Sequence, residues 1–195
     1  MQLEFSYNRI VCFIKPKTHL DNRGGFTETF VDNWFRNTIC NVDFVQDNEV
    51  YSRTVGTIRG LHYQSPPRAQ GKLVRCSAGA IFDVTVDLRP SSPNFRQWMS
   101  AHLSAANQRQ VWVPPGFAHG LCTLENDTIV SYKVTSAFSP EHDKGIAWDD
   151  SELAIKWPAL ADPSTLSEKD RNLPPLNQLS SPTQDRPRSL PEAVS

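Results

Sequence analysis

The chain has 195 residues, which is the length of one domain that can bury a sizeable core without disulfide or metal staples. Its 20 lysines and arginines balance 21 aspartates and glutamates. The resulting net charge of -1 excludes a general electrostatic attraction to nucleic acid or to an anionic membrane, although a local basic pocket for a small anion is compatible with it.

The ends and the cysteines of the sequence predict the compartment. The first ten residues, MQLEFSYNRI, have no apolar core of signal-peptide length, and no apolar run has the length of a membrane span. The four cysteines are widely spaced and form no CxxC pair; they are Cys12, Cys40, Cys76 and Cys122. We therefore expect reduced thiols rather than disulfides or a zinc site, in a soluble cytoplasmic protein.

Short segments typical of strands follow one another along most of the chain. They are IVCFI (10–14), GKLVRC (71–76), AIFDVTVDL (80–88), RQVWVP (109–114) and TIVSYKVT (128–135). Turn signals separate them, as in SPP (65–67) and RPSSPN (89–94). In 81–88, polar and apolar residues alternate, which predicts a strand with one buried face. Many short strands with frequent turns are typical of a β-sandwich or barrel.

Helical signals are weak and confined to three places. DNWFRN (32–37) predicts a short helix capped by Asp32. DDSELAIKW (149–157) predicts one or two turns capped near Asp150, and SEKD (167–170) predicts one more turn.

The end of the chain changes character. LPPLNQLSSPTQDRPRSLPEAVS (173–195) contains five prolines, and its few apolar residues have no regular period. Such a composition buries too little apolar surface to offset the entropy of ordering. We therefore expect one folded domain over residues 1–173 and a mobile tail over residues 174–195.

Polar side chains among apolar strand residues are the candidates for chemistry. They are Arg59, His62, Lys72, His119, Tyr132 and Lys133. A single histidine in such a setting is a structural, hydrogen-bonded residue about as often as a catalyst. For His119, which follows the tight turn of PPG (114–116), the structural alternative is the more frequent one.

A metal site is the next hypothesis. The motif PxGxxH (114–119) resembles the second half of the metal-binding cupin pattern, whose first half needs two histidines one residue apart and then a glutamate. Here GLHYQS offers one histidine, and Gln64 stands in the place of the second. A mononuclear metal needs three or four histidine or carboxylate ligands, so the sequence predicts no metal.

Proton transfer without a metal remains open. A neutral imidazole accepts protons well at cytoplasmic pH, especially where a carboxylate holds its other ring nitrogen. Asp170 and Asp83 are candidates for that carboxylate, and Asp87 is a weaker one. Tyr132 could deliver a proton to the opposite face of a substrate, and Lys72 could stabilise an oxyanion. Together these residues indicate cofactor-free proton transfer next to a carbonyl.

Two polar segments are candidates for recognising a nucleotide. In DNRGGFTE (21–28), Arg23 and Glu28 flank Phe26, and a guanidinium suits phosphate oxygens. The commoner alternative is a glycine turn with solvated charges. VQDN (45–48) offers amide groups that could read a base or a sugar, and its alternative is a polar strand end.

A series of motifs falls in the order of one known family. The motifs are DNRGGFTE, VQDN, IRGLHYQ, QGKLVRC, GAIFDVTVDLRPSSPNF, VWVPPGFAHGL, SYKVT, SPEHDKGIAWDD and LSEKD. They cover roughly residues 5–173, and as a series they are far more specific than any one of them. By these motifs the chain resembles the dTDP-4-dehydrorhamnose 3,5-epimerases, a group of cupin-fold nucleotide-sugar enzymes.

This resemblance implies an all-β fold, a cupin-type jelly-roll β-sandwich with a few short helices, and a homodimer. It also implies a reaction without metal or other cofactor. The substrate would be dTDP-4-dehydro-6-deoxy-D-glucose, inverted at carbons 3 and 5 to give dTDP-4-dehydro-β-L-rhamnose. The biological role would be the synthesis of dTDP-L-rhamnose for surface polysaccharide.

The resemblance also implies roles for individual residues. His62 would be the proton acceptor, with Asp170 as its carboxylate partner. Tyr132 would be the proton donor, and Lys72 would steady the oxyanion at the ketone. The positions that contact nucleotide or substrate, some of them across the dimer in the family, are Arg23, Phe26, Glu28, Gln46, Asp47, Asn48, Arg59, His119, Phe138, Asp143 and Lys169.

Two departures from the family pattern leave alternatives open. Phe138 stands where the family usually has a tyrosine that stacks on thymine, and Asp143 stands where it usually has glutamate. One alternative function is inversion at carbon 3 alone, or ketoisomerisation on the same scaffold. Another is a nucleotide-sugar-binding cupin without catalysis. A metal-dependent cupin oxygenase is a third, against which the missing second histidine argues.

Overall fold

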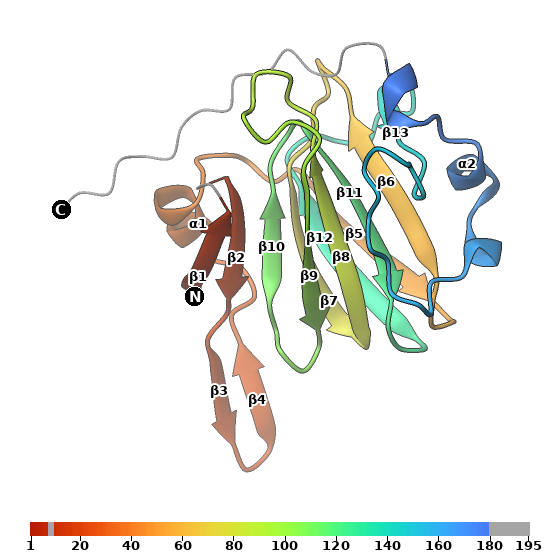
Figure 1. Ribbon diagram of the computed structural model, residues 1–195. Helices are drawn as coiled ribbons and strands as arrows, with labels where there is room; N and C mark the ends of the chain where they lie inside the picture. The colour runs from red at the N-terminus through yellow and green to blue at the C-terminus, as the bar shows by residue number, and fades with distance from the viewer. Residues whose placement is uncertain (8–9, 180–195) are drawn as a thin grey trace.

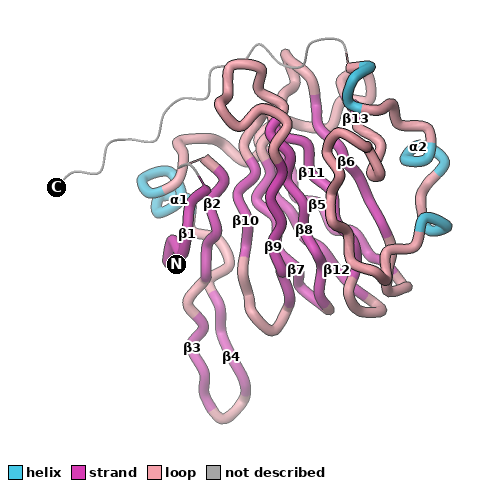
Figure 2. The backbone as a smooth tube through the Cα atoms, in the orientation of Figure 1, coloured by secondary structure: helices cyan, strands magenta, loops and turns pink. Residues whose placement is uncertain are grey.

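The computed structural model describes residues 1–7 and 10–179 of the chain. Thirteen strands form two main sheets and one separate hairpin within this part of the chain. Figure 1 shows the two main sheets with the hairpin projecting away from them, and Figure 2 shows that helices are few and short. The all-β class and the cupin-type architecture expected from the sequence are confirmed.

All strand pairs in these sheets are antiparallel. The six-stranded sheet has the order β1 (Gln2–Tyr7), β2 (Val11–Lys15), β10 (Gln110–Val113), β7 (Lys72–Ala78), β12 (Thr128–Val134) and β5 (Gln46–Ser52). The five-stranded sheet has the order β13 (Asp143–Gly145), β6 (Ile58–Gln64), β11 (Phe117–Thr123), β8 (Ala80–Asp87) and β9 (Trp98–Ser104). The separate hairpin pairs β3 (Thr18–Asp21) with β4 (Gly24–Thr27).

A core of apolar side chains joins the two main sheets face to face. Val74 and Val130 from the six-stranded sheet pack with Ile81, Leu103 and Leu121 from the five-stranded sheet. From β5 to β8 and from β9 to β12 the chain passes from one sheet to the other with each successive strand. This alternation produces the sandwich and leaves a space between the sheets where the core side chains give way to polar ones.

The five predicted strand segments correspond to β2, β7, β8, β10 and β12. The prediction that β8 has only one buried face is wrong, because both of its faces are buried. The apolar residues Val84 and Val86 face away from the sandwich interior and pack with Leu153 and Leu176 from the end of the chain. The polar residues of β8, including Asp83, therefore face the interior.

The two α-helices in the described part of the chain are short, and each lies against one of the main sheets. α1 (Asp32–Thr38) packs Phe35 against Trp112 of the six-stranded sheet. Asp32 does not cap this helix as predicted: the N-cap is Val31, and Asp32 lies in the first turn, where its carboxylate pairs with Arg36 at 2.7 Å. α2 (Glu168–Arg171) begins after Ser167 and confirms the turn predicted there.

Residues 149–157 form a single turn capped by Asp150, which confirms the shorter of the two predicted lengths: the Asp150 carbonyl accepts the Ala154 N–H at 2.9 Å, and the chain then continues without helix. The buried side chain of Asp150 also accepts hydrogen bonds from the backbone N–H groups of Glu152, Leu153 and Leu176. It thereby fixes an irregular segment over the outer face of the five-stranded sheet. Two 3₁₀ turns, η1 (Pro163–Thr165) and η2 (Leu176–Gln178), belong to the same cover.

The domain boundary predicted at Leu173 falls within packed chain. Leu176 is buried, and Leu179 packs in the same cluster. Most of the predicted mobile tail, residues 180–195, lies outside the described residues.

No helix in the described part of the chain is long and apolar enough to cross a membrane. The four cysteines form no disulfide within the described residues, and burial raises the pKa of Cys12, Cys76 and Cys122 to about 11.

Candidate active site

His62 on β6 and Asp170 in α2 form a hydrogen-bonded pair between the sheet and the C-terminal cover. The distance from His62 Nε2 to the Asp170 Oδ1 atom is 2.7 Å. Because an ionised carboxylate only accepts hydrogen bonds, this contact places the ring proton on Nε2 and leaves Nδ1 with a lone pair. A His62 ring held in this way can act as a proton acceptor through Nδ1.

The local sequence around Asp170 explains its position and its charge. Ser167 is the N-cap of α2, and its hydroxyl accepts the Asp170 N–H at 3.0 Å. Burial alone would raise the pKa of the Asp170 carboxyl, but hydrogen bonds from His62 and from the Gly60 N–H outweigh it and lower the pKa. Asp170 is therefore ionised at neutral pH.

Gly60 in the motif RGLH allows β6 and β11 to approach closely. Its φ is +113°, and a Cβ there would lie 2.6 Å from the Cα of Gly120 and 2.8 Å from the carbonyl oxygen of His119. Any larger residue would push the two strands apart. The close approach places His119 directly across from His62, as Cα partners in the antiparallel ladder.

His119 forms a second histidine–carboxylate pair. Its Nε2 atom lies 2.6 Å from the Oδ2 atom of Asp83 on β8. The sequence offered Asp83 and Asp170 as alternative partners for His62. In the structure Asp170 pairs with His62 and Asp83 pairs with His119. Each of the two neighbouring histidines therefore has its own carboxylate partner.

Lys72 lies at the beginning of β7, near the same histidines. Its Nζ atom is 3.5 Å from the carbonyl oxygen of His62, a distance at the limit of a hydrogen bond. Burial lowers the pKa of Lys72 to about 8, against the opposing influence of the Asp143 and Asp83 carboxylates; nearby Lys169 lowers it further. Lys72 is therefore mainly protonated at neutral pH and is a cation inside the sandwich.

Tyr132 on β12 reaches the interior from the opposite sheet, where it packs against the main core. Burial raises the pKa of its phenol, and nearby Asp143 adds to this, while nearby Arg59 opposes it. The hydroxyl therefore keeps its proton at neutral pH and can donate it. Asn48, its partner across the β5–β12 ladder, shares this face.

The predicted nucleotide contacts Gln46 and Phe138 lie together at one end of β5. Gln46 donates a hydrogen bond to Asn48 at 2.7 Å and accepts the backbone N–H of Phe138 at 3.1 Å. The ring of Phe138 is exposed. Arg59 is held further along, where it donates hydrogen bonds to the Ser52 hydroxyl and to the Tyr51 carbonyl at 3.1 Å each.

Gln64 is a structural residue that the sequence did not single out for this role. Its amide nitrogen donates to the carbonyl oxygens of Arg68 and Ala137, and its amide oxygen accepts the backbone N–H of Ser139. It thus ties β6 to the loop that carries Phe138. In the sequence, Gln64 stands out only because it occupies the place of the second histidine in the metal-binding cupin pattern.

Asp143 and Lys169 form an ion pair beside Lys72 and α2. This pair lies at the same edge of the five-stranded sheet as His62, because β13 pairs with β6 there. In the described residues, no group of three or more histidines, cysteines, aspartates or glutamates is arranged to hold a metal ion.

The hairpin residues Arg23, Phe26 and Glu28 are not brought to His62 within this chain. β3 and β4 project from the body of the molecule (Figure 1), and the Phe26 side chain is 67% exposed. Among the described residues, the ion-pair partner of Arg23 is Asp21 of the same hairpin, at 2.6 Å.

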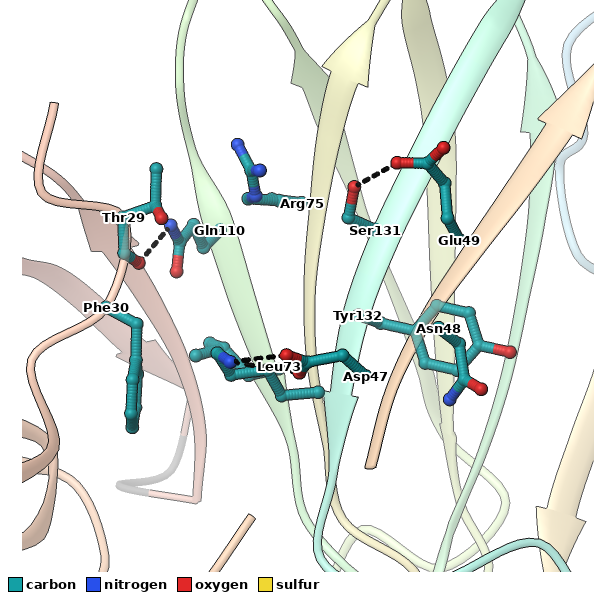
Figure 3. Close-up of a pocket in the computed structure, with 11 residues that line it drawn as sticks. Thr29, Phe30, Asp47, Asn48, Glu49, Leu73, Arg75, Gln110, Ser131 and Tyr132 are labelled. Carbon is teal, nitrogen blue, oxygen red and sulfur yellow. Dashed lines mark hydrogen bonds and ion pairs between the residues drawn. The ribbon is translucent and has the colours of Figure 1, made fainter. Parts of the chain in front are cut away.

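Asp47 also lies apart from His62 and its neighbours, because its side chain points to the outer face of the six-stranded sheet. There its carboxylate pairs with Lys133 at 2.9 Å. Both residues line an open pocket of about 380 Å³ on that face, together with Arg75. Figure 3 shows this pocket, with Gln110 on one side and Glu49 on the other.

A family model described as dTDP-4-dehydrorhamnose 3,5-epimerase matches residues 9–178. The enzyme of that name from Sinorhizobium fredii is 52% identical over 169 residues, which are 87% of this chain and 86% of that protein.

Two crystal structures resemble this one over nearly the whole chain. The dTDP-4-dehydrorhamnose 3,5-epimerase of Bacillus anthracis, with TDP and PPi bound, has 47% identity and a TM-score of 0.87, covering 90% of this chain and 99% of that one. The dTDP-6-deoxy-D-glucose-3,5-epimerase of Legionella pneumophila, in complex with dTDP-4-keto-L-rhamnose, has 40% identity and a TM-score of 0.84, covering 91% and 93%. The chain belongs to the dTDP-4-dehydrorhamnose 3,5-epimerase family.

Proposed function

We propose that this protein inverts carbons 3 and 5 of dTDP-4-dehydro-6-deoxy-D-glucose and so produces dTDP-4-dehydro-β-L-rhamnose. The observation that carries the proposal is the His62–Asp170 pair, with its 2.7 Å hydrogen bond, inside a fold of this family. A binding protein without catalysis has no need of an oriented base, whereas proton abstraction requires one within hydrogen-bond reach of a carboxylate partner.

In the proposed reaction, the ketone at carbon 4 makes the hydrogens on carbons 3 and 5 acidic. Nδ1 of His62 takes a proton from one face of the sugar, and Asp170 stabilises the imidazolium that forms. The electrons of the broken C–H bond become an enolate, with its charge on the oxygen of carbon 4. Tyr132 returns a proton to the same carbon from the opposite face, so the centre is inverted.

Lys72 is proposed to stabilise the enolate oxygen through its ammonium group. At neutral pH it carries the necessary charge, because burial lowers its pKa only to about 8. The same residues serve carbon 3 and carbon 5 in turn, since both carbons adjoin the same ketone. Before the next inversion His62 gives up a proton and Tyr132 regains one, by exchange with water.

The nucleotide is proposed to bind beside Gln46, Asn48 and Phe138. The exposed ring of Phe138 can stack on thymine, although it lacks the hydroxyl of the usual tyrosine. Arg59, His119, Asp143 and Lys169 would contact the sugar or the diphosphate. The Asp47 side chain is not part of this proposed site, because its carboxylate pairs with Lys133 on the outer face of the sheet.

We further infer that the protein works as a homodimer. The exposed hairpin supports this inference, since Phe26 is 67% exposed and Arg23 pairs with Asp21 of the same hairpin, which leaves this surface open to a second copy. Each hairpin would then complete the substrate pocket of the partner. The cytoplasm is the location we propose, and it is supported by the four cysteines, which form no disulfide within the described residues.

Conversion of the pure substrate by the purified protein tests the function. The product is trapped with a 4-ketoreductase and its stereochemistry is determined by NMR. The proposal predicts the L-sugar. A product inverted at carbon 3 alone would identify a single epimerase, and unchanged substrate that nonetheless binds would favour the binding protein.

A further inference from the structure

Asp83, the partner of His119, has no role in the reaction as proposed above. Asp83 is 1% exposed, and a carboxylate buried so deeply is costly unless it is hydrogen-bonded or paired. Its Oδ2 atom meets His119 Nε2 at 2.6 Å. The residue lies on the interior face of β8, opposite the apolar face formed by Val84 and Val86.

The surroundings of Asp83 connect it to the reacting groups. His119 is the direct cross-strand neighbour of His62, so Asp83 fixes the ring that stands next to the base. Lys72 donates toward the carbonyl oxygen of His62 from the facing sheet. Asp83 is thus bonded to the side chain that stands next to His62.

On these observations, and resting on the proposed function, we propose that Asp83 is a positioning residue of the active site. Its carboxylate fixes the orientation of His119, the cross-strand neighbour of His62. The negative charge of the same carboxylate also favours the ammonium form of Lys72.

The hydrogen bond determines what His119 can offer to a substrate. An ionised Asp83 accepts the Nε2–H, so a neutral His119 presents the lone pair of Nδ1. Among the described residues Nδ1 has no hydrogen-bond partner, which leaves it available as an acceptor for a sugar hydroxyl. Without Asp83 the ring could rotate or change tautomer, and this acceptor would be lost.

The charge of Asp83 acts on Lys72 against the effect of burial. Four groups act on the Lys72 ammonium. Asp83 from β8 and Asp143 from β13 favour the charged form, and Lys169 from α2 opposes it. The His62 carbonyl on β6 accepts a hydrogen bond from it. Because Asp143 is already paired with Lys169, the loss of Asp83 leaves Lys72 with little negative charge that is not shared. Its proton would then be lost at lower pH.

The test is the pH dependence of kcat in Asp83→Asn. The proposal predicts that the alkaline fall of kcat, near pH 8 in the native enzyme, moves down by roughly one pH unit, the size expected for removing a neighbouring charge. At pH 8, kcat should fall about fivefold, because roughly half of Lys72 is charged in the native enzyme and about a tenth in the variant. Asp87→Asn is the matched control, since Asp87 is a buried carboxylate on the same face of β8 that pairs with Arg89 instead. Its alkaline fall should stay in place.

An Asp83→Asn enzyme that is less stable but keeps the native pH profile would overturn the effect on Lys72. If that variant does not fold, ¹⁵N NMR of the native protein labelled in its histidine rings remains decisive. Neutral His119 should carry its proton on Nε2, and a proton on Nδ1 would overturn the positioning role. This second measurement needs no substrate, so it is independent of whether the proposed epimerase reaction is correct.

Discussion

Lys72 carries a charge that depends on pH close to neutrality. Its pKa is lowered to about 8 by burial, so the side chain is a cation below this pH and is neutral above it. We predict that kcat falls as the pH rises through about 8, because the enolate loses its counter-charge. In Lys72→Arg the guanidinium stays charged, and the fall near pH 8 should disappear, whatever the remaining activity. An unchanged fall in this variant would assign the titration to another group.

Phe138 tests the contribution of stacking to substrate affinity. Its exposed ring offers a face to the base but no hydroxyl. Since stacking of a base on an aromatic ring contributes about 1–3 kcal/mol, Phe138→Ala should raise KM roughly tenfold and leave kcat nearly unchanged. Phe138→Tyr is the matched control, and its KM should stay within about threefold of native. Steady-state kinetics showing the same KM for alanine and phenylalanine would place the base elsewhere.

At the scale of elements, α2 is a short helix whose start determines the position of Asp170. The Ser167 hydroxyl accepts the Asp170 N–H as the N-cap. We predict that Ser167→Ala lowers the free energy of unfolding by about 1 kcal/mol and reduces kcat severalfold, because the carboxylate is held less firmly against His62. Ser167→Thr, which keeps the hydroxyl, should restore most of both.

Denaturant unfolding and steady-state kinetics measure these two effects separately. A loss of stability with an unchanged kcat would mean that the His62–Asp170 contact holds α2 in place without help from its cap.

The element β8 shows where sequence reasoning succeeded and where it could not. Alternation correctly predicted a strand, but it gave no means of knowing that residues 146–179 would cover its apolar face. The polar face of β8 therefore reads as solvent-facing in the sequence and is interior in the structure. The same limit applies to the carboxylates: Asp83 and Asp170 were both candidates for His62. They are distinguished by the register of β6, β11 and β8 and by the position of α2 beside β6.

Other parts of the sequence also predicted the structure incompletely, because contacts with distant residues decide the outcome. The motif RGLHYQ drew attention through its polar residues, yet the need for glycine at Gly60 arises from contact with Gly120, which is distant in sequence. The predicted cap at Asp32 failed because the helix begins one residue earlier than the carboxylate suggested. The family motifs predicted His62 together with Asp170, while the pairing of His119 with Asp83 became known only from the fold.

At the scale of the whole molecule, the projecting hairpin predicts complementation between two inactive variants. His62→Ala would inactivate its own pocket, and a variant changed at both Arg23 and Phe26 to alanine would fail to complete its partner's pocket. If hairpins act across a dimer, mixed dimers contain one pocket with an intact base and an intact hairpin. Activity should therefore return after mixing and subunit exchange. The expected maximum is one active pocket in each mixed dimer.

The controls are each variant assayed alone and a mixture assayed before the subunits have had time to exchange. Sedimentation velocity establishes that dimers form. Mixed dimers without activity would mean that each hairpin serves its own chain or none.

The central claim is that the His62–Asp170 pair removes protons from the carbons next to the ketone. The measurement that tests it most directly is deuterium incorporation from heavy water into dTDP-4-dehydro-6-deoxy-D-glucose, followed by NMR. Our account predicts deuterium at carbons 3 and 5 with the native enzyme, and at neither carbon with folded His62→Ala. Incorporation at the native rate in His62→Ala would contradict it, because another group would then be the base.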